Sequence, residues 1–164
     1  VKKEKNKIII NSKNIKRKKI PEDLMRKLRS SVVLVGAILA RFNEAIFSYP
    51  GGCEIGARPI DLHLYAVRRL GVTVDDNYGK LVCSANNGLK GAKVTFSFPS
   101  VGATENIILA SALSKGRTVI HNAAREPEIS DLANFLNSAG AKIYGAGSSD
   151  IIIEGVESLH LYPK

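Results

Sequence analysis

The chain has 164 residues, a net charge of +9 and 45% hydrophobic residues, which is typical of one compact domain and excludes a disordered chain. It contains two cysteines, Cys53 and Cys83, so a disulfide-stabilised scaffold is excluded and a reducing, cytoplasmic location is expected. Its longest apolar run, residues 31–40, is about half of the roughly 20 residues that a membrane span needs, and no secretory signal is visible. The only methionine is Met25, so we expect the sequence to be a piece of a longer protein.

The positive charge is concentrated at the N-terminus. Residues 1–29 hold 12 of the 24 Lys and Arg but only 3 of the 15 Asp and Glu, so they carry the whole net charge and the remainder is neutral. A basic arm on a neutral body can bind nucleic acid. This arm has no interleaved aromatic residues for base stacking and no nucleic-acid-binding motif. A solvated arm is therefore the favoured interpretation, and nucleic-acid binding stays an alternative.

In chain order, the first predicted elements are a β-prone run in residues 7–15, a helix at 31–41 that is apolar nearly all round, and a strand at 44–48. An amphipathic helix follows at residues 59–70, with a proline in its first turn and a glycine as its stop signal. Residues 71–89 then predict two strands joined by a turn rich in Asn, Asp and Gly, as in a β-hairpin.

The same order of elements occurs a second time along the chain. The second set is predicted at residues 104–113, 117–122, 127–139 and 140–159. The chain is therefore predicted to contain two αβαββ units, preceded by the closing strand of a missing unit. The fold class is α/β, with the two apolar helices buried and the sheets outside.

We expect one partial domain over residues 1–164. It divides into an arm with the orphan closing strand (1–20), a first full repeat (21–90) and a second full repeat (91–160). A missing unit would leave an apolar flank uncovered, so we expect self-association through this flank.

The stretch "PGGCEIGARP" carries the clearest chemical signal. Two glycines before Cys53 permit backbone conformations closed to other residues, which indicates a turn or mobile loop that exposes the thiol. Arg58 and the start of the following helix would both favour the thiolate. The structural alternative is a small residue in a tight turn. The guanidinium of Arg58 suits a carboxylate or phosphate, whereas Arg29, just before the apolar helix, is equally explained as an anion ligand or as a solvated helix-start residue.

Small residues open the second apolar helix at Ser100, Gly102 and Thr104, where free backbone N–H groups could hold a phosphate, although ordinary capping uses the same residue types. Acidic residues begin two other helices, where the helix dipole favours them on structural grounds alone: Asp61, Glu126 and Glu128. The three histidines lack metal-ligand spacing, so no metal or cofactor is expected. From residues alone, the sequence predicts a reactive-cysteine loop beside anion-binding features, and thus a phosphorylated substrate.

Four segments carry a family resemblance: "LRSSVVLVGAILARF", "PGGCEIGARPIDLHL", "FPSVGATENIILASAL" and "NAAREPEISDLANFLNSAGAKIYGAG". Over residues 24–159 the chain resembles the UDP-N-acetylglucosamine 1-carboxyvinyltransferases. That resemblance implies two inside-out α/β barrels, each of three βαβαββ units. The chain would then be most of one barrel, without that barrel's first unit and without the other barrel.

The resemblance also implies an activity and its partners. Such enzymes transfer the enolpyruvyl group of phosphoenolpyruvate to the 3′-hydroxyl of UDP-N-acetylglucosamine and release phosphate, which is the first committed step of peptidoglycan synthesis. It thereby implies roles in cell-wall biogenesis, cell shape and cell division, and no cofactor. The remainder of the parent chain supplies further site residues, so we expect this chain alone to be inactive.

Residue by residue, the resemblance matches Cys53 to the loop cysteine that is linked to protonation of phosphoenolpyruvate and is alkylated by fosfomycin. It matches Arg29 and Arg58 to arginines that bind phosphoenolpyruvate. The remaining matches are a uridine-binding stretch, a diphosphate-binding stretch and two acids near the site: Pro59, Asp61 and Leu62; Ser100, Val101 and Gly102; Glu126 and Glu128. Phe98 departs from the pattern, because some members carry a lysine there.

Three rival interpretations remain. The enolpyruvyl transferase of shikimate metabolism is related but lacks the cysteine loop, so "PGGCEIGARP" argues against it. A degenerate or split relative could act only in binding or assembly. The basic-arm nucleic-acid binder is the third.

Overall fold

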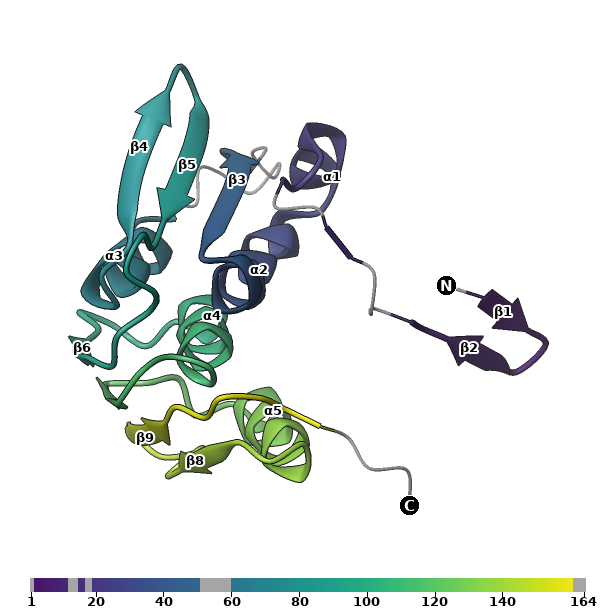
Figure 1. Cartoon of the computed structure of the whole chain (residues 1–164). Coiled ribbons are helices and arrows are strands. Elements are labelled where there is room, and N and C mark those ends of the chain that lie inside the picture. Colours follow the sequence, from purple (N-terminus) through teal and green to yellow (C-terminus); the bar gives the residue numbers. More distant parts are fainter. Residues whose placement is uncertain (1, 12–14, 17–18, 51–59, 161–164) are drawn as a thin grey trace.

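The computed structural model describes residues 2–11, 15–16, 19–50 and 60–160, and the side chain of Arg29 is not among the described groups. Two α/β units follow one another in the chain, each with its own sheet (Figure 1). The predicted α/β class and the two repeats are therefore confirmed.

The first unit forms a three-stranded antiparallel sheet in the order β3-β5-β4. Its elements are α1 (Glu22–Lys27), the 3-10 helix η1 (Arg29–Val33), α2 (Leu34–Phe42), β3 (Glu44–Ser48), α3 (Asp61–Arg69), β4 (Thr73–Asn77) and β5 (Lys80–Ser84). Ahead of them, Lys19 forms an isolated parallel bridge to Ile46 of β3, and the Ile20 N–H donates to the Ile46 carbonyl at 2.8 Å. An extended segment thus pairs with β3 on the side away from β5.

The second unit repeats this topology. Its sheet has the order β6-β7-β9-β8, in which β6 is parallel to β7 and the other pairs are antiparallel. Its elements are β6 (Lys93–Thr95), α4 (Val101–Ser111), β7 (Arg117–His121), α5 (Pro127–Ser138), β8 (Lys142–Tyr144) and β9 (Asp150–Glu154). Each unit therefore begins with a short parallel strand, which the αβαββ pattern lacked and the βαβαββ resemblance implied.

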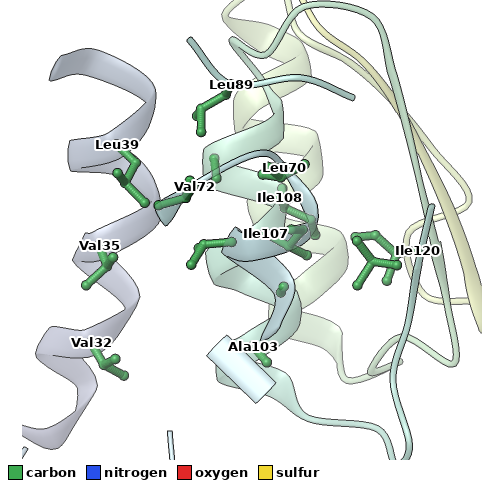
Figure 2. Packing of buried hydrophobic residues seen from close by; sticks show 14 of the residues in the cluster. Val32, Val35, Leu39, Leu70, Val72, Leu89, Ala103, Ile107, Ile108 and Ile120 are labelled. Atoms are coloured by element: carbon green, nitrogen blue, oxygen red, sulfur yellow. The ribbon is translucent and has the colours of Figure 1, made fainter. Parts of the chain in front are cut away.

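Helices α2 and α4 pack side by side between the two sheets (Figure 1). Figure 2 shows Val32, Val35 and Leu39 on the side of η1 and α2 that faces α4, opposite Ile107. The two backbones approach closely at Gly36, where an added Cβ would lie under 3.0 Å from Asn106.

The prediction that both apolar helices are buried nearly all round is wrong for α2. Leu34 is 51% exposed, and residues 37, 38 and 40 are only partly covered. α4 fits the prediction, because α2, α3 and α5 all pack against it. The described chain supplies α2 with neighbours on fewer sides, so part of its apolar surface remains open.

The N-terminal arm forms a hairpin of β1 (Lys2–Glu4) and β2 (Lys7–Ile9) that projects away from the two units (Figure 1). Every residue of both strands is exposed, including Ile8 at 64%. The predicted closing strand thus corresponds to β2, which pairs with a β1 strand that the sequence pattern did not indicate. The proposed domain boundaries at residues 20 and 90 stay a prediction.

Candidate functional site

The starts of η1, α3 and α4 meet at one end of the molecule. Gly102, in the first turn of α4, lies against His63 of α3 and Val33 of η1. An added Cβ at Gly102 would lie 3.2 Å from the His63 Cε1 atom and 3.8 Å from the Val33 Cγ2 atom. Asp61 and Leu62 open the same first turn of α3 that carries His63. The stretches matched to uridine and to the diphosphate are therefore neighbours in space.

The amide of Asn106 holds these helices together. Its Oδ1 accepts from the Gly36 N–H, and its Nδ2 donates to the Val32 carbonyl at 3.2 Å and lies 3.0 Å from the His63 Nδ1. Because an amide nitrogen can only donate, the His63 Nδ1 atom accepts and carries no proton in this arrangement. One buried side chain thus fixes α4 to η1, α2 and α3.

Sequence reasoning missed Asn106 and left His63 unassigned. The available signal was an asparagine within the apolar run "NIILASAL", where a buried amide requires hydrogen-bond partners. These residues lie behind the helix starts, so they position the first turns of α3 and α4.

The first turn of α4 has the capped geometry that the sequence predicted. Ser100 is the N-cap with an extended backbone, and its Oγ accepts from the Ala103 N–H at 3.4 Å. The first N–H groups of a helix have no partner within it, so those of Val101 and Gly102 point out of the end of α4. Thr104 does not contribute to this end, because it is fully buried and its Oγ1 accepts from the Ala124 N–H at 3.1 Å.

The predicted acids lie at the start of α5. Glu126 is the N-cap residue and its carboxylate accepts from the Arg125 N–H at 2.8 Å, while Glu128 stands in the first turn. Partial burial raises the pKa of Glu105 on α4, and the negative charge of Glu128 adds to this effect. The first turns of α4 and α5 are therefore electrostatically coupled, and in the described region the local roles of Glu126 and Glu128 are structural.

The cysteine stretch lies outside the described residues. This applies to Cys53, Arg58 and Pro59, and Arg29 is described only as the backbone start of η1. Its flanks are anchored, since Phe47 before it and Ile60 after it are both buried. The other cysteine, Cys83, is a buried free thiol of β5 whose pKa burial raises to about 11, so it is inert core.

Comparisons with known proteins agree with this arrangement. The chain is 52% identical over 93% of its length to UDP-N-acetylglucosamine 1-carboxyvinyltransferase 2 of Caldanaerobacter subterraneus subsp. tengcongensis. It is 55% identical over 85% of its length to the enzyme of that name from Endomicrobium trichonymphae, and 45% identical over 97% to that of Staphylococcus aureus. It spans 36%, 34% and 38% of these relatives, or about a third of their length.

Solved structures share the fold. The enolpyruvyl transferase NikO from Streptomyces tendae matches 85% of this chain, and the chain covers 33% of it, with a TM-score of 0.71 and 25% identity. An EPSP synthase from Acinetobacter baumannii matches 80% of the chain, which covers 29% of it, with a TM-score of 0.61 and 19% identity; this shows the fold alone. The family model of EPSP synthase (3-phosphoshikimate 1-carboxyvinyltransferase) matches residues 1–162. With the repeated units and the adjoining helix starts, this match shows that the chain belongs to the EPSP synthase family.

Proposed function

We propose that this chain is the cysteine-bearing part of a UDP-N-acetylglucosamine 1-carboxyvinyltransferase. The observation that carries the proposal is its 45–55% identity, over most of its length, to enzymes of that name. The enolpyruvyl group of phosphoenolpyruvate would pass to the 3′-hydroxyl of UDP-N-acetylglucosamine, with release of phosphate. This places the parent protein in peptidoglycan synthesis and in the cytoplasm.

The arrangement of helix starts supports these substrates. The outward-pointing N–H groups of Val101 and Gly102 and the positive end of the α4 dipole suit a diphosphate. Asp61, exposed one turn from His63, is placed to accept from the uracil ring N–H, with Leu62 beside it. Uridine and diphosphate groups are adjacent in the nucleotide, as these two helix starts are in the fold.

The chemistry requires groups beyond the described residues. We assign Cys53 as the thiol linked to protonation of phosphoenolpyruvate, and Arg58 and Arg29 as the guanidiniums that bind its phosphate and carboxylate. Pro59 completes the uridine stretch. Because the chain spans about a third of its relatives, the remaining site residues belong to the rest of the parent chain, and turnover requires both parts.

Phosphate release tests the proposal. The parent-length protein should release phosphate from phosphoenolpyruvate with UDP-N-acetylglucosamine but not with 3-phosphoshikimate, whereas the 164-residue chain alone should release none. The reverse substrate preference would contradict the assignment. In the parent protein, Asp61→Ala should raise the KM for UDP-N-acetylglucosamine by about ten- to a hundredfold, the effect of losing a hydrogen bond to a charged group.

Fosfomycin tests the thiol directly. Intact-mass analysis should show one adduct on the parent protein and none on its Cys53→Ala variant, since Cys83 is buried. An adduct that persists in Cys53→Ala would contradict the assignment of Cys53.

The exposed flank supports self-association of the isolated chain. A groove of about 620 Å³ lies between α2, α4 and α5, lined largely by small and aliphatic residues such as Ala37, Leu109 and Leu136. Size-exclusion chromatography of the 164-residue chain should show a mass that rises with concentration, and a monomer at every concentration would refute this.

A further inference from the structure

A tyrosine at the end of β3 is hydrogen-bonded to the neighbouring hairpin. The Tyr49 hydroxyl donates to the Asp76 Oδ2 atom at 3.0 Å, and the Asp76 Oδ1 atom accepts from the Gly79 N–H at 2.9 Å. One carboxylate therefore closes the β4–β5 turn and also holds the residue that follows β3 by one position. We call this hydrogen bond between Tyr49 and Asp76 the tether.

The hairpin geometry explains how Tyr49 reaches Asp76. Strand β5 lies between β3 and β4, and Ser48 and Asn77 both pair with Lys80. The two turn residues, Tyr78 and Gly79, have φ values of 53° and 82°, which fit a two-residue hairpin turn. The position next to Tyr49 in the register is thus Gly79, whose lack of a side chain leaves the path across the end of β5 open.

The tether holds the last part of the chain before the cysteine stretch. Phe47 is buried in the core, and Ile60 is buried at the other side of the stretch. Between these anchors and Cys53 the chain has no further buried hydrophobic residue among those described. Tyr49, which lies four positions before Cys53 in the sequence, is therefore the last described side chain to be fixed to the sheet.

The electrostatic surroundings keep the hydroxyl protonated. The hydrogen bond to Asp76 raises the pKa of Tyr49 above its ordinary value, and partial burial and the negative charges of Asp76 and Asp61 act in the same direction, against Arg68. The tether is thus present throughout the neutral range. The effect of Asp61 also shows that the start of α3 lies near Tyr49.

We propose that Tyr49 is a positioning residue for the Cys53 thiol: the tether to Asp76 fixes where the chain leaves β3 and so holds the thiol beside the positive groups that activate it. This inference deepens the proposed function and rests on its assignment of Cys53. It concerns a pair of residues that stand outside the helix starts described above.

The test is the rate at which iodoacetamide alkylates Cys53 in the 164-residue chain, measured by peptide mass spectrometry as a function of pH. Tyr49→Phe removes the tether and one hydroxyl. Losing one hydrogen bond corresponds to a fall of about two- to tenfold in the rate at neutral pH. The midpoint of the pH profile should also rise towards that of a free cysteine, a shift that loss of fold stability alone would not produce.

Two further variants isolate the tether. Tyr78→Phe changes a fully exposed tyrosine of the same hairpin and should leave the profile unchanged. Asp76→Asn should retain most of the effect, because the amide oxygen can still accept from Gly79 and its N–H can donate to the tyrosine oxygen. Circular dichroism should show all variants folded.

The proposal is overturned if Tyr49→Phe has the same profile as Tyr78→Phe. It is also overturned if Cys53 of the unmodified chain reacts like the same cysteine in a free peptide of residues 49–61. Failure of the proposed function is a separate result, namely no phosphate release by the parent protein with UDP-N-acetylglucosamine.

Discussion

Helices α2 and α4 occupy equivalent places in the two units, yet they are covered to different extents. Most residues of α4 are buried, because α2, α3 and α5 all pack against it. In α2 only Val35, Gly36 and Leu39 are buried, along the side that faces α4. The same topology thus gives one central helix and one flank helix, and the contact between them, at Gly36 and Asn106, joins the two units.

Gly36→Ala should cause the largest loss of stability. An added Cβ would lie under 3.0 Å from the backbone and side-chain oxygens of Asn106, so the two helices must separate. We expect the free energy of unfolding to fall by about 3–5 kcal/mol, measured by urea denaturation. Gly→Ala in a helix is otherwise stabilising, so an unchanged or higher stability would show that the close contact is absent.

Asn106→Leu should have the next largest effect. It leaves the Gly36 N–H and the Val32 carbonyl without their buried partner and frees the His63 ring. We expect a loss of about 2–4 kcal/mol. Ser111→Ala is the matched control on α4, since the buried Ser111 hydroxyl has no hydrogen-bond partner among the described residues. The control should be neutral or slightly stabilising, and equal losses in both variants would contradict the role of the amide.

The equivalent sheet positions in the two units give a pH test. Cys83 on β5 pairs with Ala45, and Ile153 on β9 pairs with Thr118 at the same register. Burial raises the pKa of Cys83 from an ordinary value of 9.0 to about 11. The folded state therefore binds this proton more tightly than the unfolded state. Its contribution, on the order of 2–3 kcal/mol, is complete below pH 9 and is lost as the pH rises through 11. Cys83→Ala should flatten the unfolding free energy between pH 9 and 11, and an unchanged slope would refute this origin.

The same comparison predicts a gain of stability at Thr118. Its unit-one equivalent is the apolar Ala45, whereas the fully buried Thr118 Oγ1 has no hydrogen-bond partner among the described residues. Thr118→Val preserves the shape and removes the unpaired hydroxyl, so the free energy of unfolding should rise by about 1 kcal/mol. A loss of stability in thermal unfolding would indicate that the hydroxyl is paired.

The elements that the sequence predicted correctly carry long local signals. The helix α5 begins at Pro127 as predicted, because proline is favoured in the first turn, and β3 and both hairpins follow from alternation and turn residues. The leading strands were missed, because β6 has three residues and Lys19 makes a single bridge, so neither has a recognisable period. Their conformation comes from parallel pairing with a strand more than 20 residues away.

The candidate site divides in the same way. The cap at Ser100 follows from local residue types, whereas the contact between Asn106 and His63 joins residues 43 positions apart. The tether between Tyr49 and Asp76 spans 27 positions and depends on the strand order, which one sequence without relatives does not reveal. Local chemistry is thus readable from the chain, while the groups that hold it in place are known only from the fold.

The smallest effect is expected on the open side of α2. Leu34→Gln changes a half-exposed side chain, so at low concentration the free energy of unfolding should change by no more than about 0.5 kcal/mol. Val35→Gln, one position along and buried against α4, should cost several kcal/mol and serves as the control. At high concentration, Leu34→Gln should instead lower the apparent mass in size-exclusion chromatography, because it places an amide on the flank through which the chains would associate. If Leu34→Gln and Val35→Gln destabilised the monomer equally, α2 would be covered on both sides and its difference from α4 would disappear.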